Sequence, residues 1–243
     1  MCIRDSFRVP FLVGLLVGPA GIYIRRHVPE PAASAEVVGS DVPKTPVREV
    51  LRSHKLAVLL TIGVLAATTC LNYMITYIPT YAIKTLGLPH STGFIATVVA
   101  GVVLLLVTSY AGHVSDRTGQ ITIMIPAAAG ILVLIYPMFA LMVAAPGLGV
   151  LIVVLFVMAL LKACYFGPMG ALMTSLFPTS TRATGMAVGY NVGVAIFGGF
   201  TPLIAQWLLS STGVDTSPAW WVVFAAAVSL VCLVAIRKRL GLR

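Results

Sequence analysis

The stretch Gly112-His113-Val114-Ser115-Asp116-Arg117-Thr118-Gly119 decides the fold of this chain. It is a polar loop of eight residues that separates two long apolar runs, near residues 91–111 and 121–144. An apolar run of about 20 residues is long enough to cross a bilayer as an α-helix. Two such helices joined by so short a loop are antiparallel neighbours, so the stretch predicts a helical hairpin embedded in a membrane.

The composition of the whole chain agrees with a membrane protein. Charged residues make up 9% of the sequence, against about 25% in an average soluble domain. Hydrophobic residues make up 59%, which leaves too little polar surface to cover a water-soluble globule. The apolar runs are continuous and not alternating, so they favour helices over an outer-membrane barrel. The predicted fold class is all-α, a polytopic membrane helical bundle with the lipid bilayer around it.

Several other classes of protein are excluded. The net charge is +9, but Lys and Arg lie almost wholly between or beyond the apolar runs, so nucleic acid is not expected as a partner. The four cysteines have no metal-ligand spacing. The sequence has no phosphate-binding Gly-Lys-Ser/Thr loop and no nucleophile with a plausible base. We therefore expect no enzyme activity, no metal and no cofactor.

Seven apolar runs divide the chain. They lie near residues 9–24, 56–83, 91–111, 121–144, 148–176, 184–210 and 219–236. We expect residues 1–6 to be an artefactual or foreign start, 7–26 to be a membrane helix and 27–55 to be a proline-containing cytoplasmic linker that ends in a short interfacial helix. Residues 56–236 then form a six-helix bundle, and 237–243 form a cytoplasmic tail.

The positions of Lys and Arg predict the orientation in the membrane. Twelve of these residues share the side of the linker: Arg25, Arg26, Lys44, Arg48, Arg52, Lys55, Arg117, Arg182, Arg237, Lys238, Arg239 and Arg243. The opposite side holds three, which are Arg4, Arg8 and Lys84. The linker, the polar loop around Asp116 and the C-terminus are therefore expected in the cytoplasm of a multi-pass protein.

Several motifs resemble those of one family. The Gly-x-x-Ser-Asp-Arg-x-Gly spacing of residues 112–119 resembles the cytoplasmic-loop signature of the major facilitator superfamily. Within it, the segments 7–12, 23–26, 77–81, 176–185, 196–202 and 217–221 resemble the metabolite:proton symporter family, most closely members that carry citrate, tricarballylate or proline and betaine. Gln120 departs from the motif, because the family commonly has a basic residue there.

The resemblance implies a secondary transporter of the bacterial-type inner (plasma) membrane. It implies proton-coupled symport by alternating access, with the substrate at the bilayer midplane between two six-helix halves. Seven helices with a long linker after the first match the C-terminal half of a major facilitator fold plus the preceding helix, so a missing N-terminal half is expected as a partner. The proton gradient would supply the energy.

The loop motif is a candidate cytoplasmic gate, formed by Gly112, Ser115, Asp116, Arg117 and Gly119. The resemblance implies that such loops hold the cytoplasmic faces of the two halves together while the site opens outward. In the alternative, Asp116 caps the start of a helix and Arg117 follows the inside-positive bias.

Lys162 is the strongest single candidate for a functional residue, since it lies near the middle of the apolar run 148–176 with no acidic residue within two turns. A lysine at this depth costs about 2.5–3.5 kcal/mol. We expect its ammonium to face a cavity and to attract a carboxylate of the substrate; snorkelling or burial against carbonyls is the alternative. Tyr165 lies on the same helical face and is a further substrate-binding candidate.

Further substrate-binding candidates are polar or aromatic groups of the other spans. They are Asn72, Tyr73 and Tyr77 in the run 56–83, and Asn191 in the run 184–210. Gly185, Gly189 and Gly193 form a small-residue ridge for close helix packing.

All seven acidic residues fall outside the predicted spans, so proton coupling comes only from the resemblance and its acid is expected in the missing half. The expected substrate is a small organic acid or zwitterion. The alternatives left open are an efflux pump for drugs or sugar acids, and a non-transporting membrane receptor or scaffold.

Overall fold

A computed structural model describes residues 17–27 and 46–240 of the chain. The chain divides into two units, residues 1–44 and 45–243. In the first, helix α3 spans Val17–His27 and covers part of the predicted helix 7–26. The expected foreign start at 1–6, most of the linker and the last three residues lie outside the described residues.

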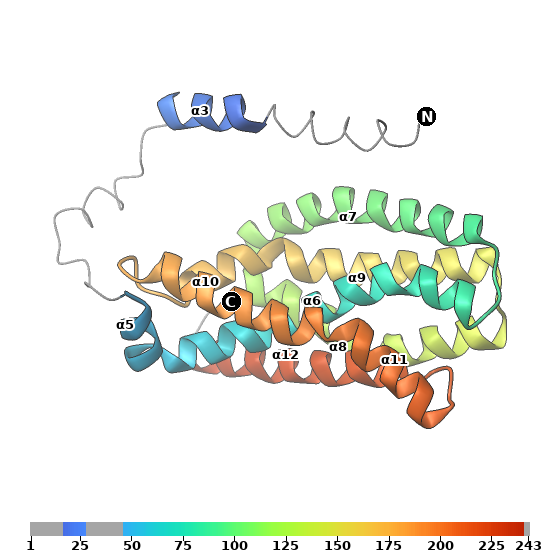
Figure 1. Cartoon of the computed structure of the whole chain (residues 1–243). Coiled ribbons are helices and arrows are strands. Elements are labelled where there is room, and N and C mark those ends of the chain that lie inside the picture. Colours follow the sequence, from blue (N-terminus) through green and yellow to red (C-terminus); the bar gives the residue numbers. More distant parts are fainter. Residues whose placement is uncertain (1–16, 28–45, 241–243) are drawn as a thin grey trace, which may run out of the picture. The chain divides into compact units, whose positions relative to one another are not determined.

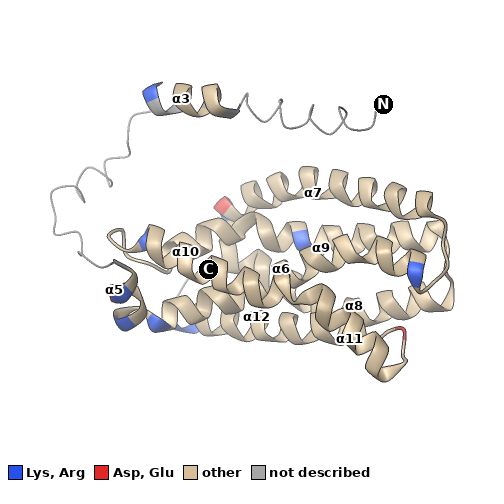
Figure 2. Cartoon of the chain, in the orientation of Figure 1, with Lys and Arg blue, Asp and Glu red and all other residues tan. Residues whose placement is uncertain are grey.

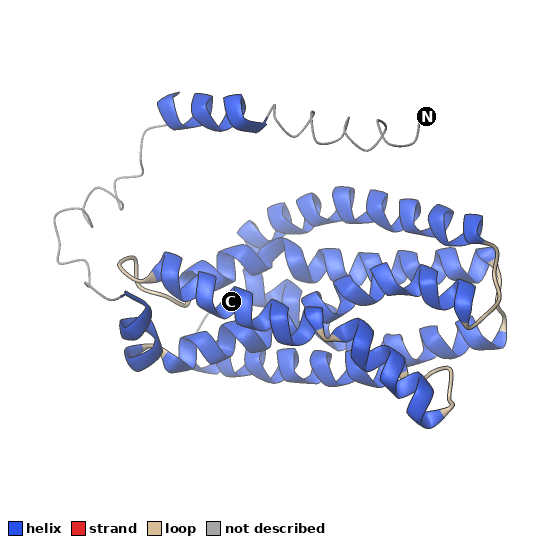
Figure 3. Cartoon of the chain, in the orientation of Figure 1, coloured by secondary structure: helices blue, strands red, loops and turns tan. Residues whose placement is uncertain are grey.

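The second unit is a bundle of helices, and no strand occurs among the described residues (Figure 3). After the short α5 (Pro46–Ser53) come α6 (Lys55–Lys84), α7 (His90–Thr118), α8 (Gln120–Ala144) and α9 (Leu148–Ser175). They are followed by α10 (Arg182–Val194), a π-helical turn at Ala195–Gly199, α11 (Thr201–Thr212) and α12 (Pro218–Leu240). Six segments of the described chain are long and apolar enough to cross a membrane, which confirms the all-α polytopic bundle.

Helix α6 occupies the centre of this bundle. It contacts α7, α9, α10, α11 and α12, and its residues from Val64 to Leu71 are all buried. The helices around it carry apolar side chains on their outer faces, such as Phe94 and Leu105 of α7 and Val231 of α12. Because these outer faces would be costly in water, the bundle has the surface expected of a protein surrounded by lipid. Figure 1 shows the helices of the bundle running side by side.

Ser229 of α12 is inserted into the backbone ladder of α6. Its hydroxyl accepts a hydrogen bond from the amide of Ala67 at 2.8 Å and donates one to the carbonyl of Gly63 at 2.6 Å. A regular α-helix would pair these two backbone groups with each other. Gly63 makes the approach possible, since a Cβ there would lie 2.2 Å from the sulfur of Cys232.

The predicted loop at residues 112–119 is wrong in one respect. Helix α7 continues through Thr118, and only Gly119 separates it from α8. The polar side chains fit a helix because Ser115 and Thr118 donate hydrogen bonds to carbonyls three and four residues earlier, at 2.6 and 3.0 Å. Gly119 makes the reversal with φ of 92°, a conformation that favours glycine. The antiparallel hairpin itself is present.

The predicted run 184–210 is also not one regular helix. The structure divides it into α10, the π-helical turn and α11. Pro202 lacks an amide hydrogen and cannot donate to the carbonyl of Gly198, so the α-helical ladder cannot continue unchanged through this point. Thr201 stabilises the junction, because its hydroxyl bonds to the carbonyl of Phe197 at 2.5 Å and accepts from the indole of Trp221 at 2.9 Å.

The glycine ridge of α10 packs closely against its neighbours. A Cβ on Gly189 would lie 2.7 Å from the methyl carbon of Thr61, and one on Gly193 would lie 3.1 Å from Leu65. A Cβ on Gly185 would lie 2.4 Å from the ring of Phe177. The small residues thus let α10 approach α6, which carries one wall of the candidate site.

Charged residues of the bundle gather at its ends. Figure 2 shows Lys and Arg concentrated at the end where α5, the start of α6 and the start of α10 lie. One basic residue breaks this pattern, and it lies within α9, whose only Lys or Arg is Lys162.

Candidate functional site

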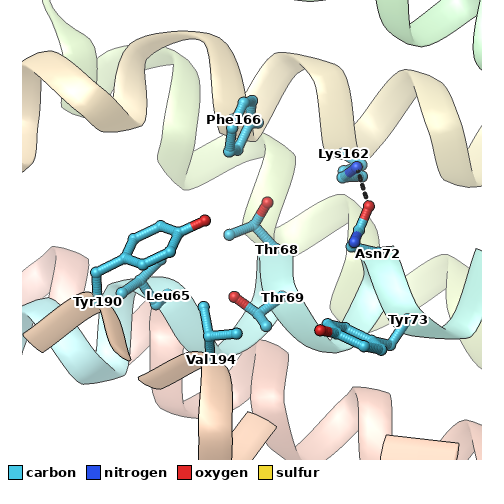
Figure 4. Close-up of a pocket in the computed structure, with 9 residues that line it drawn as sticks. All are labelled: Leu65, Thr68, Thr69, Asn72, Tyr73, Lys162, Phe166, Tyr190 and Val194. Atoms are coloured by element: carbon cyan, nitrogen blue, oxygen red, sulfur yellow. Dashed lines mark hydrogen bonds between the residues drawn. The ribbon is translucent and has the colours of Figure 1, made fainter. Parts of the chain in front are cut away.

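A polar cavity of about 200 Å³ opens between α6, α9 and α10. Nine residues line it: Leu65, Thr68, Thr69, Asn72 and Tyr73 from α6, Lys162 and Phe166 from α9, and Tyr190 and Val194 from α10. Figure 4 shows these side chains around the space, with those of α9 opposite those of α6. The walls therefore combine one cation, an amide, two threonine hydroxyls and three aromatic rings, two of which are phenols.

Lys162 is the charged group of this cavity. Its half-buried ammonium donates a hydrogen bond of 2.5 Å to Oδ1 of Asn72 and lies 5.8 Å from the centroid of the Phe166 ring. No ion pair joins it to any residue in the described part of the chain. An amide oxygen and a ring face satisfy an ammonium only partly, so the site keeps a net positive charge that an anion can neutralise.

Helical spacing brings the polar residues of α6 to one wall. Thr68 and Asn72 are four residues apart, as are Thr69 and Tyr73, so the two pairs form adjacent rows. Gly198 lies against the second row, since a Cβ there would be 2.6 Å from the Tyr73 ring and 2.9 Å from the methyl of Thr69. The π-helical turn thus packs directly behind this wall.

Three of the predicted substrate-binding residues lie elsewhere. Tyr165 is fully buried in the core, and its hydroxyl donates a 2.7 Å hydrogen bond to the carbonyl of Val64. Tyr77 bonds to Oε1 of Gln206 on α11 at 3.0 Å. Asn191 turns its amide onto the carbonyl of Ala187 in its own helix, at 2.7 Å. The structure thus brings Lys162, Asn72 and Tyr73 together, but not these three.

Sequence reasoning missed part of the lining. Thr68 precedes Asn72 by one helical turn, and that spacing could have identified it. Tyr190 was overlooked in favour of its neighbour Asn191, because Asn191 was judged by its depth in the run and not by the direction of its side chain. Which face of α10 meets α6 follows from the glycine ridge only once the two helices are seen together.

The candidate gate residues have separate positions at the end of α7. Gly112 lies against the backbone of Gly167 on α9, and Ser115 is buried. Asp116 and Arg117 are exposed and make no ion pair with another described residue. Because Asp116 lies in the last turn of α7 and α8 has no side-chain cap hydrogen bond, Asp116 does not cap the start of a helix, and that part of the alternative is wrong. The inside-positive interpretation of Arg117 stays a prediction.

The described residues contain no group of three or more His, Cys, Asp or Glu that could hold a metal ion. The cavity itself has no carboxylate among its lining residues. Its lining combines the ammonium of Lys162 with an amide, hydroxyls and aromatic rings.

A bundle of six apolar spans with a polar cavity beside its central helix has the architecture of a membrane transport protein. The model of the family described as "Sugar (and other) transporter" matches residues 27–240. The chain therefore belongs to this family, within the major facilitator superfamily. This result agrees with the resemblance seen in the sequence, and it places the chain among transporters and not among enzymes.

Individual relatives are also transporters. The chain is 32% identical to the ectoine/proline transporter ProP of Corynebacterium glutamicum over 242 residues, which cover 94% of this chain and 47% of the relative. It is 27% identical to the proline/betaine transporter of Escherichia coli, over 96% of this chain and 48% of that protein. It is 29% identical to the citrate-proton symporter of Klebsiella pneumoniae, over 96% and 53%. The chain thus spans about half the length of these relatives, and no solved structure matches it.

Proposed function

We propose that this chain forms the C-terminal half of a secondary transporter that carries a small organic acid or zwitterion with protons by alternating access. The half-length match to transporters of ectoine and proline, proline and betaine, and citrate supports this proposal. Substrate would bind between this bundle and a second, N-terminal half that completes the transporter. The proton-binding acid would lie in that second half, because the cavity described here has none.

The observation that carries the proposal is the position of Lys162. A cation in the middle of an apolar helix is unfavourable, and here it faces a cavity in place of the core. Substrates named for the relatives, proline, betaine and citrate, all contain a carboxylate. A carboxylate would accept a charge-assisted hydrogen bond from this ammonium, which is about twice as strong as a neutral one.

Uptake by the complete transporter that carries this chain tests the proposal. Cells would be given radiolabelled proline, glycine betaine or citrate at equal concentration, with and without a protonophore that collapses the proton gradient. We expect concentrative uptake of at least one of these carboxylates, and we expect the protonophore to abolish it. Outward transport of apolar compounds with no carboxylate uptake would favour an efflux pump and overturn the proposal.

We further propose that the basic end of the bundle lies in the cytoplasm of a bacterial inner membrane. The clustering of Lys and Arg at that end supports this orientation. Single cysteines placed at Arg117 and at Asp215 should react differently with a membrane-impermeant maleimide in intact cells. The cysteine at Asp215 should be labelled and the one at Arg117 should be protected until the cells are opened; the reverse pattern would refute this orientation.

The gate remains part of this proposal. Asp116 and Arg117 are exposed at the basic end of the bundle and lack partners among the described residues, so both are free to pair with charged groups of a second half. Salt bridges worth a few kcal/mol are enough to shift an equilibrium between two conformations.

A further inference from the structure

We infer that the hydroxyl of Thr68 is a second hydrogen-bond donor to the substrate carboxylate, beside the ammonium of Lys162, and that Tyr165 is the positioning residue that keeps this hydroxyl available. The inference rests on the proposed function, and it assigns a role to two residues outside the Lys162–Asn72 pair. One of them lines the cavity without a partner, and the other lies in the core behind it.

Thr68 combines a cavity position with an unsatisfied polar group. Its side chain is 2% exposed, and its oxygen has no hydrogen-bond partner among the described residues. The residue lines the cavity, and Figure 4 shows its hydroxyl on the side that faces Phe166 and Lys162 of α9. A buried hydroxyl without a partner is unfavourable, so a ligand that supplies an acceptor there would relieve this cost.

A threonine within a helix ordinarily satisfies itself by donating to the carbonyl four residues earlier. Thr76 and Thr97 do so in this chain, at 3.1 and 2.8 Å. For Thr68 the corresponding acceptor is the carbonyl of Val64. That carbonyl already accepts a 2.7 Å hydrogen bond from Tyr165 and lies 3.4 Å from the hydroxyl of Ser229.

The lone pairs of this carbonyl are therefore in use. An α-helix also directs the amide of Thr68 at the Val64 carbonyl, and a carbonyl oxygen has two lone pairs. The bond from Tyr165 thus leaves no favourable position for the threonine hydroxyl on its own helix. Tyr165 thus acts at the site without touching the substrate, because it keeps the Thr68 hydroxyl from bonding to its own helix.

Thr68 and Lys162 are placed to share one ligand. Thr68 lies one helical turn from Asn72, and Asn72 holds the ammonium of Lys162. A carboxylate accepts several hydrogen bonds at once, so it can take one from the ammonium and another from the hydroxyl. A compound of similar shape that lacks this acceptor would leave the hydroxyl unpaired and would be bound less well.

Substitution of Thr68 tests the first part of the inference in the complete transporter. Thr68→Val removes the hydroxyl at nearly constant shape, and Thr68→Ser keeps it. We expect the valine variant to raise KM for the carboxylate substrate by about 10- to 100-fold, with the serine variant close to wild type. Uptake would be measured with labelled proline or citrate, whichever the wild type accumulates, and corrected for the amount of protein in the membrane.

Thr61→Val is the matched control. Thr61 is on the same helix, is fully buried and also has an unpartnered oxygen, but it lies against Gly189 and does not line the cavity. Loss of its hydroxyl should leave KM unchanged. Equal KM values for the Thr68→Val, Thr61→Val and wild-type proteins would overturn the inference.

A double-mutant cycle tests the role of Tyr165. Tyr165→Phe frees the Val64 carbonyl, so Thr68 can turn onto its own helix and KM should rise. In the Thr68→Val background the same change should leave KM unaltered, because no hydroxyl remains to be positioned. Equal effects of Tyr165→Phe in both backgrounds would show a merely structural role.

Two outcomes separate failure of the proposed function from failure of this inference. If the wild-type transporter takes up no carboxylate at all, the proposed function fails and this inference fails with it. If uptake is normal and KM is unchanged in Thr68→Val, the inference alone is overturned.

Discussion

Replacement of Lys162 by Met in the complete transporter should reduce kcat/KM for carboxylate uptake by about 30-fold or more. Removal of one partner from a buried, hydrogen-bonded charge pair costs about 2–5 kcal/mol, and the ammonium is the charged group of the cavity. The same change should not destabilise the protein, because it removes a charge from the middle of a membrane helix. Uptake of the labelled carboxylate and thermal unfolding of the purified protein would be measured together.

Lys84→Met is the control for this prediction. Lys84 is exposed in the last turn of α6 and is distant from the cavity lining, so its loss should leave uptake unchanged. Unaltered transport in the Lys162→Met variant would contradict the proposed role of the ammonium. Loss of uptake together with loss of folded protein would instead assign Lys162 to the structure of the bundle.

The second large effect is expected at the crossing of α7 and α9. A Cβ added to Gly167 would lie 2.8 Å from both the amide nitrogen of Gly112 and the carbonyl oxygen of Thr108. Both atoms belong to the backbone and cannot rotate away, so the two helices would have to separate. Gly167→Ala should therefore lower the free energy of unfolding by about 1–3 kcal/mol. The midpoint of thermal unfolding should fall by about 2–4 °C for each kcal/mol.

Gly170→Ala provides a comparison within the same helix. No atom lies within 4 Å of the position that its Cβ would occupy, and alanine favours helix more than glycine does. This variant should unfold at or slightly above the temperature of the wild type. If the alanine at 167 behaved in the same way, the close contact between the two backbones would not contribute to stability.

This contact changes the interpretation of the motif at residues 112–119. The close approach needs a glycine at position 167, whereas a Cβ on Gly112 would meet only the carbonyl oxygen of Gly167, at an ordinary 3.8 Å. Ser115 is bonded to its own helix and Gly119 makes the turn. Two positions of the motif, Ser115 and Gly119, are thus explained by local hydrogen bonding and backbone conformation. Asp116 and Arg117 remain exposed, and only these two are available for a gate.

The membrane helices could be predicted from the sequence because hydrophobic length is a direct consequence of bilayer thickness. The boundaries at Gly119 and at Gly147, and the whole of α8, lie within a few residues of the prediction. The extension of α7 through Thr118 was missed, because polarity was taken as a sign of a loop although a helix end in contact with water is equally polar. The π-helical turn was missed since hydrophobicity contains no information about which backbone carbonyls lose their partners.

The candidate site was predicted only in part. Lys162 was identifiable because a charge within an apolar run is conspicuous, and Asn72 and Tyr73 followed from polarity in a neighbouring span. Tyr165 shows the limit of such reasoning, since its spacing from Lys162 is right but its ring points into the core. The rotation of a helix about its own axis depends on packing against all its neighbours, and a single amphipathic pattern is too weak in lipid to define it.

The insertion of Ser229 into α6 has a mechanical consequence for any rocking motion of the bundle. Bonds to two backbone groups of the central helix fasten α12 to the turn that immediately precedes Thr68. If α12 slid or tilted on its own, both of these hydrogen bonds would break in a medium that offers no water to replace them. We therefore expect α6 and α12 to move together as one rigid unit. Any shift of one helix against another would then occur at other helix–helix contacts of the bundle.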